Sequence, residues 1–295
     1  MPTGNTARRR LLPLLFLFLP GVRSVAQPAA DAVGRLTPAQ AQSLIDRALA
    51  NELAAAQDQT HPMRYLLRKT SPRLTSAKEI IETRDGEVAR LVSINDQPLS
   101  AADQQKEQAR LEALAADPGL QRHRNQSQDA DTRRALKVLR VLPQAFLYQD
   151  HGKSTTPAGI IEKFTYKPNP AFTPPDLESQ VLTVMTGELW VDPAQERVVH
   201  LDGSLVQDVD FGWGILGRLN KGGWIVIDQT DIGANQWRTA HFQMKLTGRV
   251  LLKTRVFDTV ETETAFAPVP EGIPYSQGIK LLLEETPGGA VKNSP

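Results

Sequence analysis

Cysteine is absent from this chain of 295 residues. The fold therefore contains no disulfide, and its stability has to come from a buried core. A chain of this length can bury roughly 75% of its unfolded surface, which is enough for such a core. The absence also excludes lipid attachment through a cysteine after an N-terminal leader.

Motifs that would name a reaction are also lacking. The five histidines show no H-E-x-x-H or other metal-ligand spacing, and there is no phosphate loop, G-x-S-x-G or S-x-x-K. Gly212, Gly214 and Gly217 match G-x-G-x-x-G, but the surrounding pattern is not βαβ, so a dinucleotide site is not expected. We expect no catalytic motif, no metal site and no cofactor, although catalytic residues dispersed in the sequence remain an open alternative.

Long apolar runs are missing too, except near the N-terminus. Three arginines, Arg8 to Arg10, precede the apolar run Leu11–Leu19, and Ser24-Val25-Ala26 follows as a small-residue cleavage pattern. This is typical of a secretory signal peptide over residues 1–26, cut between Ala26 and Gln27. The run is shorter than the ~20 residues a membrane span needs, so we expect no transmembrane span in the mature chain.

Charge gives no sign of a nucleic-acid partner. The formal net charge of the whole chain is +1, and the leader is its basic part, so the mature chain is slightly acidic. The expected location is outside the inner membrane, in the periplasm.

Residues 181–264 read as strands joined by tight turns. In Asn235–Leu246, Ala240, Phe242, Met244 and Leu246 alternate with polar residues, which indicates a strand with one apolar face. Asp85-Gly86 and Asp202-Gly203 both suit two-residue hairpin turns. An apolar sheet face of this kind needs a second layer or a ligand to cover it.

Helices supply that second layer. Thr37-Pro38-Ala39-Gln40 predicts a helix start with a capping box, and an apolar stripe follows. Ser100 starts a second helix that stops at Pro118-Gly119, and a third is expected over Asp131–Leu142. We therefore predict one α+β domain over residues 27–285, with a helical insertion at 100–142 and a disordered tail at 286–295. Its sheet is antiparallel and strongly curved, an open half-barrel with helices covering its concave face.

This arrangement resembles the LolA/RseB-type lipoprotein carriers and sensors of the bacterial periplasm. The features that carry the resemblance are the leader followed by an amphipathic helix, the helical insertion, and the G-x-L-W-V-D run at Gly187 to Asp192. The segment 211–224 also resembles one in secreted proteins of soil bacteria. The resemblance to the carriers implies a half-barrel that holds a lipid or the lipid part of a lipoprotein. No site residue of the carriers is matched to a position here.

The candidate binding residues come from the glycine-dense segment 210–224. Large apolar residues among glycines form either a hydrophobic lip over a lipid-sized cavity or a connection folded into the core. The residues of the lip are Phe211, Trp213, Ile215, Leu216, Leu219 and Trp224. His200 and Asp202 lie on the same side of a strand and form a second candidate pair, too few for a zinc site.

The favoured function is a non-enzymatic binding protein that holds a hydrophobic ligand, such as an acyl chain, a lipid or a lipoprotein. The alternatives are an envelope interaction module that contacts another envelope protein, and a hydrolase with dispersed catalytic residues.

Overall fold

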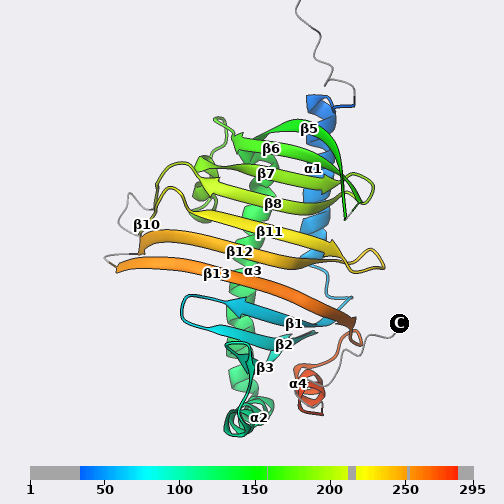
Figure 1. The fold of residues 1–295 in the computed structure, drawn as a ribbon, viewed down its shortest axis with the longest axis vertical. Coiled ribbons are helices and arrows are strands. Elements are labelled where there is room, and N and C mark those ends of the chain that lie inside the picture. Colours follow the sequence, from blue (N-terminus) through cyan, green and yellow to red (C-terminus); the bar gives the residue numbers. More distant parts are fainter. Residues whose placement is uncertain (1–33, 158, 212–216, 251–252, 285–295) are drawn as a thin grey trace, which may run out of the picture. The chain divides into compact units, whose positions relative to one another are not determined.

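A single antiparallel sheet of 13 strands forms the framework of the computed structural model, and it does not close into a barrel (Figure 1). The structure describes residues 34–157, 159–211, 217–250 and 253–284. The predicted leader, its predicted cleavage site Ala26/Gln27 and the predicted tail therefore lie outside the described residues. The hydrogen-bonded order is β4-β3-β2-β1-β13-β12-β11-β8-β7-β6-β5, with β9 and β10 attached beside β12. The strands are β1 Met63–Thr70, β2 Thr75–Thr83, β3 Gly86–Ile94, β4 Gln97–Pro98, β5 Phe146–Thr156, β6 Gly159–Pro168, β7 Met185–Asp192, β8 Arg197–Leu205, β9 Val209–Phe211, β10 Gly217–Leu219, β11 Trp224–Asp231, β12 Trp237–Val250 and β13 Lys253–Pro268.

Helices accompany the sheet, which confirms the predicted α+β class and the open, curved antiparallel sheet. Their bounds are α1 Pro38–Ala55, α2 Ala101–Ala116, α3 Pro118–Ala145, α4 Tyr275–Glu284 and a 3₁₀ helix, η2, Glu178–Val184. In Figure 1, α1 and α3 both run behind the sheet, across the direction of the strands. Among the described residues, no helix combines the length and apolar character that crossing a membrane would require.

The helix starts follow the local sequence closely. Thr37 caps α1, and its capping box with Gln40 is complete, as predicted. Ser100 caps α2 by accepting the N–H of Asp103. The third helix is much longer than the predicted span 131–142, because Pro118 ends α2 and also starts α3. Proline suits the first position of a helix, and the Asp117 side chain accepts the first free N–H groups.

Strand β8 corrects the expected hairpin at Asp202-Gly203. Both residues lie inside the continuous strand β8 and pair with β11. Glycine is required at 203 for space, since a Cβ would lie 2.6 Å from the Tyr166 hydroxyl and 2.8 Å from the Met185 sulfur. Gly187 is more tightly confined still, because a Cβ there would lie 2.1 Å from the Asp202 carbonyl oxygen. The same region holds a second correction, since Val181 to Val184 form part of η2 and not of a strand.

The two largest of the four hydrophobic clusters among the described residues lie on opposite faces of the sheet, and we call them the two cores. The larger core packs α1 and the end of α3 onto the concave face of β5 to β8, with Ile45, Phe164 and Leu189 at its centre. The other packs α2 and α4 against Ile81 and Val88 of β2 and β3. Those two side chains alternate with Ile80 and Ala89, so α4 covers the outer face at that edge. The strands between, β11 to β13, belong to neither core.

A buried ion pair fixes α1 onto the sheet beside the larger core. Glu52 of α1 accepts two hydrogen bonds from the Arg197 guanidinium, at 2.8 and 3.0 Å. The same carboxylate accepts the Val198 N–H at 2.9 Å and the Gln229 side-chain amide at 2.9 Å. Both charged residues are only 9% exposed. The four contacts connect α1 to β8 and β11 and satisfy the carboxylate that burial would otherwise penalise.

Replacing Glu52 by Ala should destabilise the protein by about 3 kcal/mol, because Arg197 would keep a buried charge without its partner. The matched control is Arg47→Ala, which removes the exposed ion pair of Arg47 with Glu196 from the same helix. That change should cost below about 1 kcal/mol. Urea unfolding of the two variants measures both values, and equal losses would contradict the assigned role of Glu52.

Candidate functional site

A large cavity lies between the concave face of the sheet and helices α1 and α3. Its volume is about 1690 Å³. An ordinary small-molecule pocket holds roughly 300–1,000 Å³, so this cavity exceeds that range. It lies over the strands that neither core covers.

Apolar side chains line the middle of this cavity, and they come from every surrounding element. The sheet contributes Leu201, Ile225, Ile227, Phe242, Met244 and Leu246, while α3 and η2 contribute Leu136, Val138, Leu139, Leu142, Val181 and Leu182. The sheet residues are only half-buried, and apart from Leu201, which packs against the larger core, none of them belongs to a hydrophobic cluster of the described residues. Phe242, Met244 and Leu246 belong to the apolar face predicted for this strand.

A bulge decides which residues of β12 reach the cavity. The pairing with β11 shifts between Asp228 and Gln229, so that His241 and Thr239 take consecutive partners and Ala240 is left over. Thr239 lines the cavity on one side of the bulge and Phe242 on the other, while Trp237 and Arg238 both line it at the start of the strand. Simple alternation from Ala240 could not show this.

The predicted lip residues have different locations. Phe211 and Leu219 line the cavity at the end where β9 and β10 attach. Trp224 does not line it, since its neighbour Ile225 does and successive strand side chains face opposite ways. Trp213, Ile215 and Leu216 lie outside the described residues, so their role in ligand binding stays a prediction.

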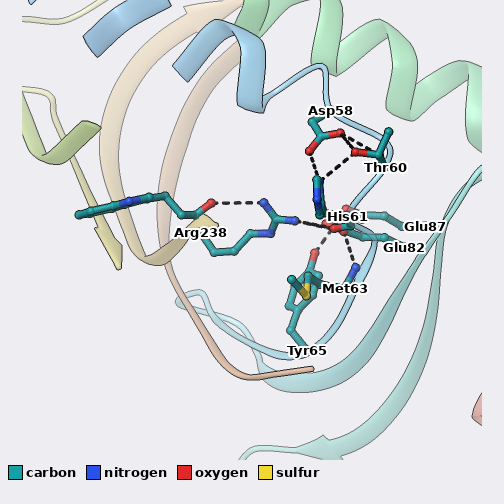
Figure 2. A network of polar contacts seen from close by, with 9 residues as sticks. Asp58, Thr60, His61, Met63, Tyr65, Glu82, Glu87 and Arg238 are labelled. Atoms are coloured by element: carbon teal, nitrogen blue, oxygen red, sulfur yellow. Dashed lines mark hydrogen bonds and ion pairs between the residues drawn. The ribbon is translucent and has the colours of Figure 1, made fainter. Parts of the chain in front are cut away.

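Charged residues surround the opposite end of the cavity (Figure 2). Arg238 lies at the centre of the network, 3.8 Å from the Glu82 carboxylate, and it donates to the His61 carbonyl at 2.8 Å. Glu82 also accepts the Met63 N–H at 2.7 Å, and the Tyr65 hydroxyl donates to Glu87 at 3.3 Å. No sequence pattern indicates this group, because its members come from β1, β2, β3 and β12.

The carboxyl groups here are crowded and poorly hydrated. Burial raises the pKa of Glu82 and that of Glu87 above the usual range of a glutamate. Glu263 lies on the neighbouring strand β13, where burial, together with the charges of Glu87, Glu261 and Glu82, raises its pKa to about 8. One arginine, Arg238, opposes three carboxyl groups, so protonation relieves the repulsion between them. This end of the cavity can therefore both donate and accept hydrogen bonds at neutral pH.

His200 and Asp202 do come together, but on the face of the sheet that points away from the cavity. The imidazole Nδ1 lies 2.6 Å from Asp228, which the sequence did not single out, and Nε2 lies 3.2 Å from Asp202. Trp190 packs on the ring at 4.4 Å between centroids. Both ring nitrogens are within hydrogen-bond distance of a carboxylate, so the pair connects neighbouring strands and leaves neither nitrogen for a substrate. Among the described residues, no group of three or more His, Asp or Glu side chains is arranged to hold a metal ion.

Comparison with known proteins gives only a distant similarity. No protein-family model matches the chain, and no curated protein does. A crystal structure from Vibrio parahaemolyticus, described as an outer membrane lipoprotein-sorting protein domain, aligns over 82% of this chain and 100% of its own. The identity is 12% and the TM-score 0.30. That similarity does not assign the chain to a family, so its function has to be argued from its own cavity.

Replacing Glu263 by Gln should stabilise the protein at pH 8 and have little effect near pH 4. The folded state holds the carboxyl proton up to a pKa of about 8, well above its ordinary value. The stability that Glu263 contributes is therefore complete below its ordinary pKa and is lost as the pH rises toward 8 and beyond. The neutral amide avoids that loss, and the melting temperature at pH 8 should rise by about 3 °C.

Thermal unfolding of wild type and Glu263→Gln from pH 4 to pH 9 measures this difference. The fully buried Glu162, whose pKa burial and the neighbouring Asp150 raise to about 7, is present in both proteins and cancels. Asp258→Asn is the matched control on the same strand; it loses the 3.8 Å ion pair with Lys245 and should not gain stability. Parallel pH profiles for wild type and Glu263→Gln would contradict the prediction.

Proposed function

We propose that this protein is a secreted, periplasmic binding protein that holds a hydrophobic ligand in the cavity between its sheet and α1 and α3. The ligand class is an acyl chain, a lipid or the lipid part of a lipoprotein, and no chemical step is involved. The observation that carries the proposal is the large cavity with an apolar middle, where a folded domain of this size would ordinarily have a core.

The physical argument rests on the half-buried sheet residues. An apolar ligand would bury Ile225, Ile227, Phe242 and Met244, which the two cores leave without a covering layer. Burial stabilises by about 0.8 kcal/mol for each methylene group removed from water. A long chain offers many such groups, whereas a small polar metabolite offers none. The volume also exceeds what one drug-sized molecule fills.

The ends of the cavity suit an amphipathic ligand. Its middle is apolar, while Arg238, Glu82 and Glu87 lie at one end and Arg218 and Arg249 at the other. A lipid has the same division into an apolar chain and a polar group. The polar ends would keep the hydrogen-bonding groups of such a ligand satisfied, which purely apolar walls would not do.

Lipid uptake should fall when a charge is introduced on the cavity face of β11, and not when it is introduced on the opposite face. Ile227→Glu puts a carboxylate in the cavity and should reduce binding of palmitate or phosphatidylglycerol at least tenfold, because the buried charge has no partner. Val226→Glu is the matched control, because Val226 is the neighbouring residue, is also half-buried, and faces the other side. Native mass spectrometry of the mature protein with each lipid measures both.

Protein purified from its own envelope provides the decisive comparison. A co-purifying lipid, lost in Ile227→Glu and kept in Val226→Glu, would support the carrier function and identify the ligand class. A ligand-free mass together with no uptake of either added lipid would reject it and favour an interaction module of the envelope. Turnover of an added lipid ester would instead favour the hydrolase.

A further inference from the structure

Exposed apolar and cationic side chains gather at the end of the cavity beside β9 and β10. β12 and β13 extend beyond β11 here, and β10 pairs with β12 from Gly217–Val250 to Leu219–Gly248. We call this surface the β12–β13 rim. Its described residues are Phe211, Arg218, Arg249, Lys253, Arg255, Val256 and Phe257. Val256 is 60% exposed and Phe257 43%, which is unusual for large apolar residues in a strand.

Positive charge dominates this rim, although the mature chain as a whole is slightly acidic. Asp210 and Asp208 are both bound by Arg218, at 2.7 Å and 3.3 Å. Within the described ranges, Arg249, Lys253 and Arg255 are exposed and lie in no ion pair. Four cations therefore face two carboxylates at the rim, and Lys253 and Arg255 extend beyond the Asp208 and Asp210 pair that Arg218 binds.

Apolar and cationic groups occur on both faces of the β12–β13 hairpin. Arg255 and Phe257 pair with Gly248 and Leu246 and share the cavity side of the strand. Val256, between them, points to the opposite side. A flat protein partner would contact one of these faces and leave the other in water. A fluid bilayer interface surrounds an inserted hairpin on all sides, so it matches this distribution better.

The rim is also continuous with the cavity. Phe211, Arg218, Leu219 and Arg249 line the cavity and lie at this end of the strands. Whatever binds the rim therefore lies next to residues that line the cavity.

We propose that the β12–β13 rim docks on an anionic phospholipid bilayer, with Val256 and Phe257 at the boundary between headgroups and acyl chains. Arg249, Lys253 and Arg255 would then face the phosphate groups. Apolar side chains flanked by cations are the usual composition of interfacial binding surfaces, where burial and charge attraction act together. The inference goes beyond the proposed ligand-binding function, since a protein could hold lipid without binding a membrane.

Co-sedimentation of the mature protein with vesicles tests the docking directly. Vesicles of phosphatidylcholine alone are compared with vesicles that also contain phosphatidylglycerol. Wild type should bind the anionic vesicles, and added salt should weaken the binding because it screens the charges. The triple change Arg249→Glu, Lys253→Glu and Arg255→Glu should weaken it about 100-fold, at about fivefold or more for each cation lost.

Two further variants separate charge and apolar contributions. Val256→Ser with Phe257→Ser should weaken binding at high salt more than at low salt, because the cations remain. The control reverses Arg133, Arg140 and Lys280, which are exposed on α3 and α4, to Glu, and should bind like wild type. Equal melting temperatures show that each variant is folded.

The proposal is overturned if wild type binds neither kind of vesicle, if it binds both equally, or if the rim variant and the helix control lose binding equally. A rim that binds a protein partner would give the first of these results. Palmitate uptake by the wild type distinguishes this failure from failure of the ligand-binding function, because palmitate in solution requires no membrane.

Discussion

The contact between Glu52 and Arg197 is the constraint on which the cavity depends. Helix α1 is anchored by its apolar stripe only to β5 to β8, and the cavity begins beyond that core. Glu52 lies at this boundary and binds β8 through Arg197 and Val198 and β11 through Gln229. A hydrophobic residue could stabilise the helix as well as a buried ion pair can. Directional hydrogen bonds also fix the distance between helix and sheet. The cavity contains no packed side chains of the described residues that could hold this distance.

A cavity in place of a core has a thermodynamic consequence. The strands β11 to β13 keep their backbone hydrogen bonds, but their concave side chains lack the dispersion contacts of a packed interior. The two cores therefore flank a middle region of lower local stability, and a ligand that fills it would bind the folded state only. Stability would then rise with ligand concentration by mass action. The same gap explains why crowded carboxyl groups are tolerated at one end, since the cavity leaves them room that a core would take.

The sequence predicted local features better than distant ones. The capping box at Thr37 and the α+β class with an open sheet follow from short-range rules, and the structure has both. A hairpin also joins β2 and β3, but its two loop residues are Arg84 and Asp85, one position before the predicted Asp85-Gly86 turn. The hairpin turn predicted at Asp202-Gly203 was wrong. Gly203 leaves space for the side chains of Tyr166 and Met185, which are distant in the sequence. Pro118-Gly119 predicts the end of a helix, and the sequence pattern does not indicate that Pro118 also begins α3. For the site, Phe211 and Leu219 do line the cavity, whereas Glu82, Glu87, Glu263 and Arg238 meet only through the pairing of β1 with β2 and β13.

The position of the rim bears on how a hydrophobic ligand could enter. An acyl chain that crossed water would expose its apolar surface, at a cost of about 25 cal/mol for each Å². Because Phe211, Leu219, Arg218 and Arg249 belong to the cavity lining and lie at the rim, a bilayer docked there would adjoin the cavity without an aqueous gap. The headgroup would stay among Arg218 and Arg249 while the chain passed over Leu246 and Met244. Along this path the acyl chain passes from one apolar environment to another. The free-energy barrier to transfer would then come from ordering of the acyl chain and not from its hydration.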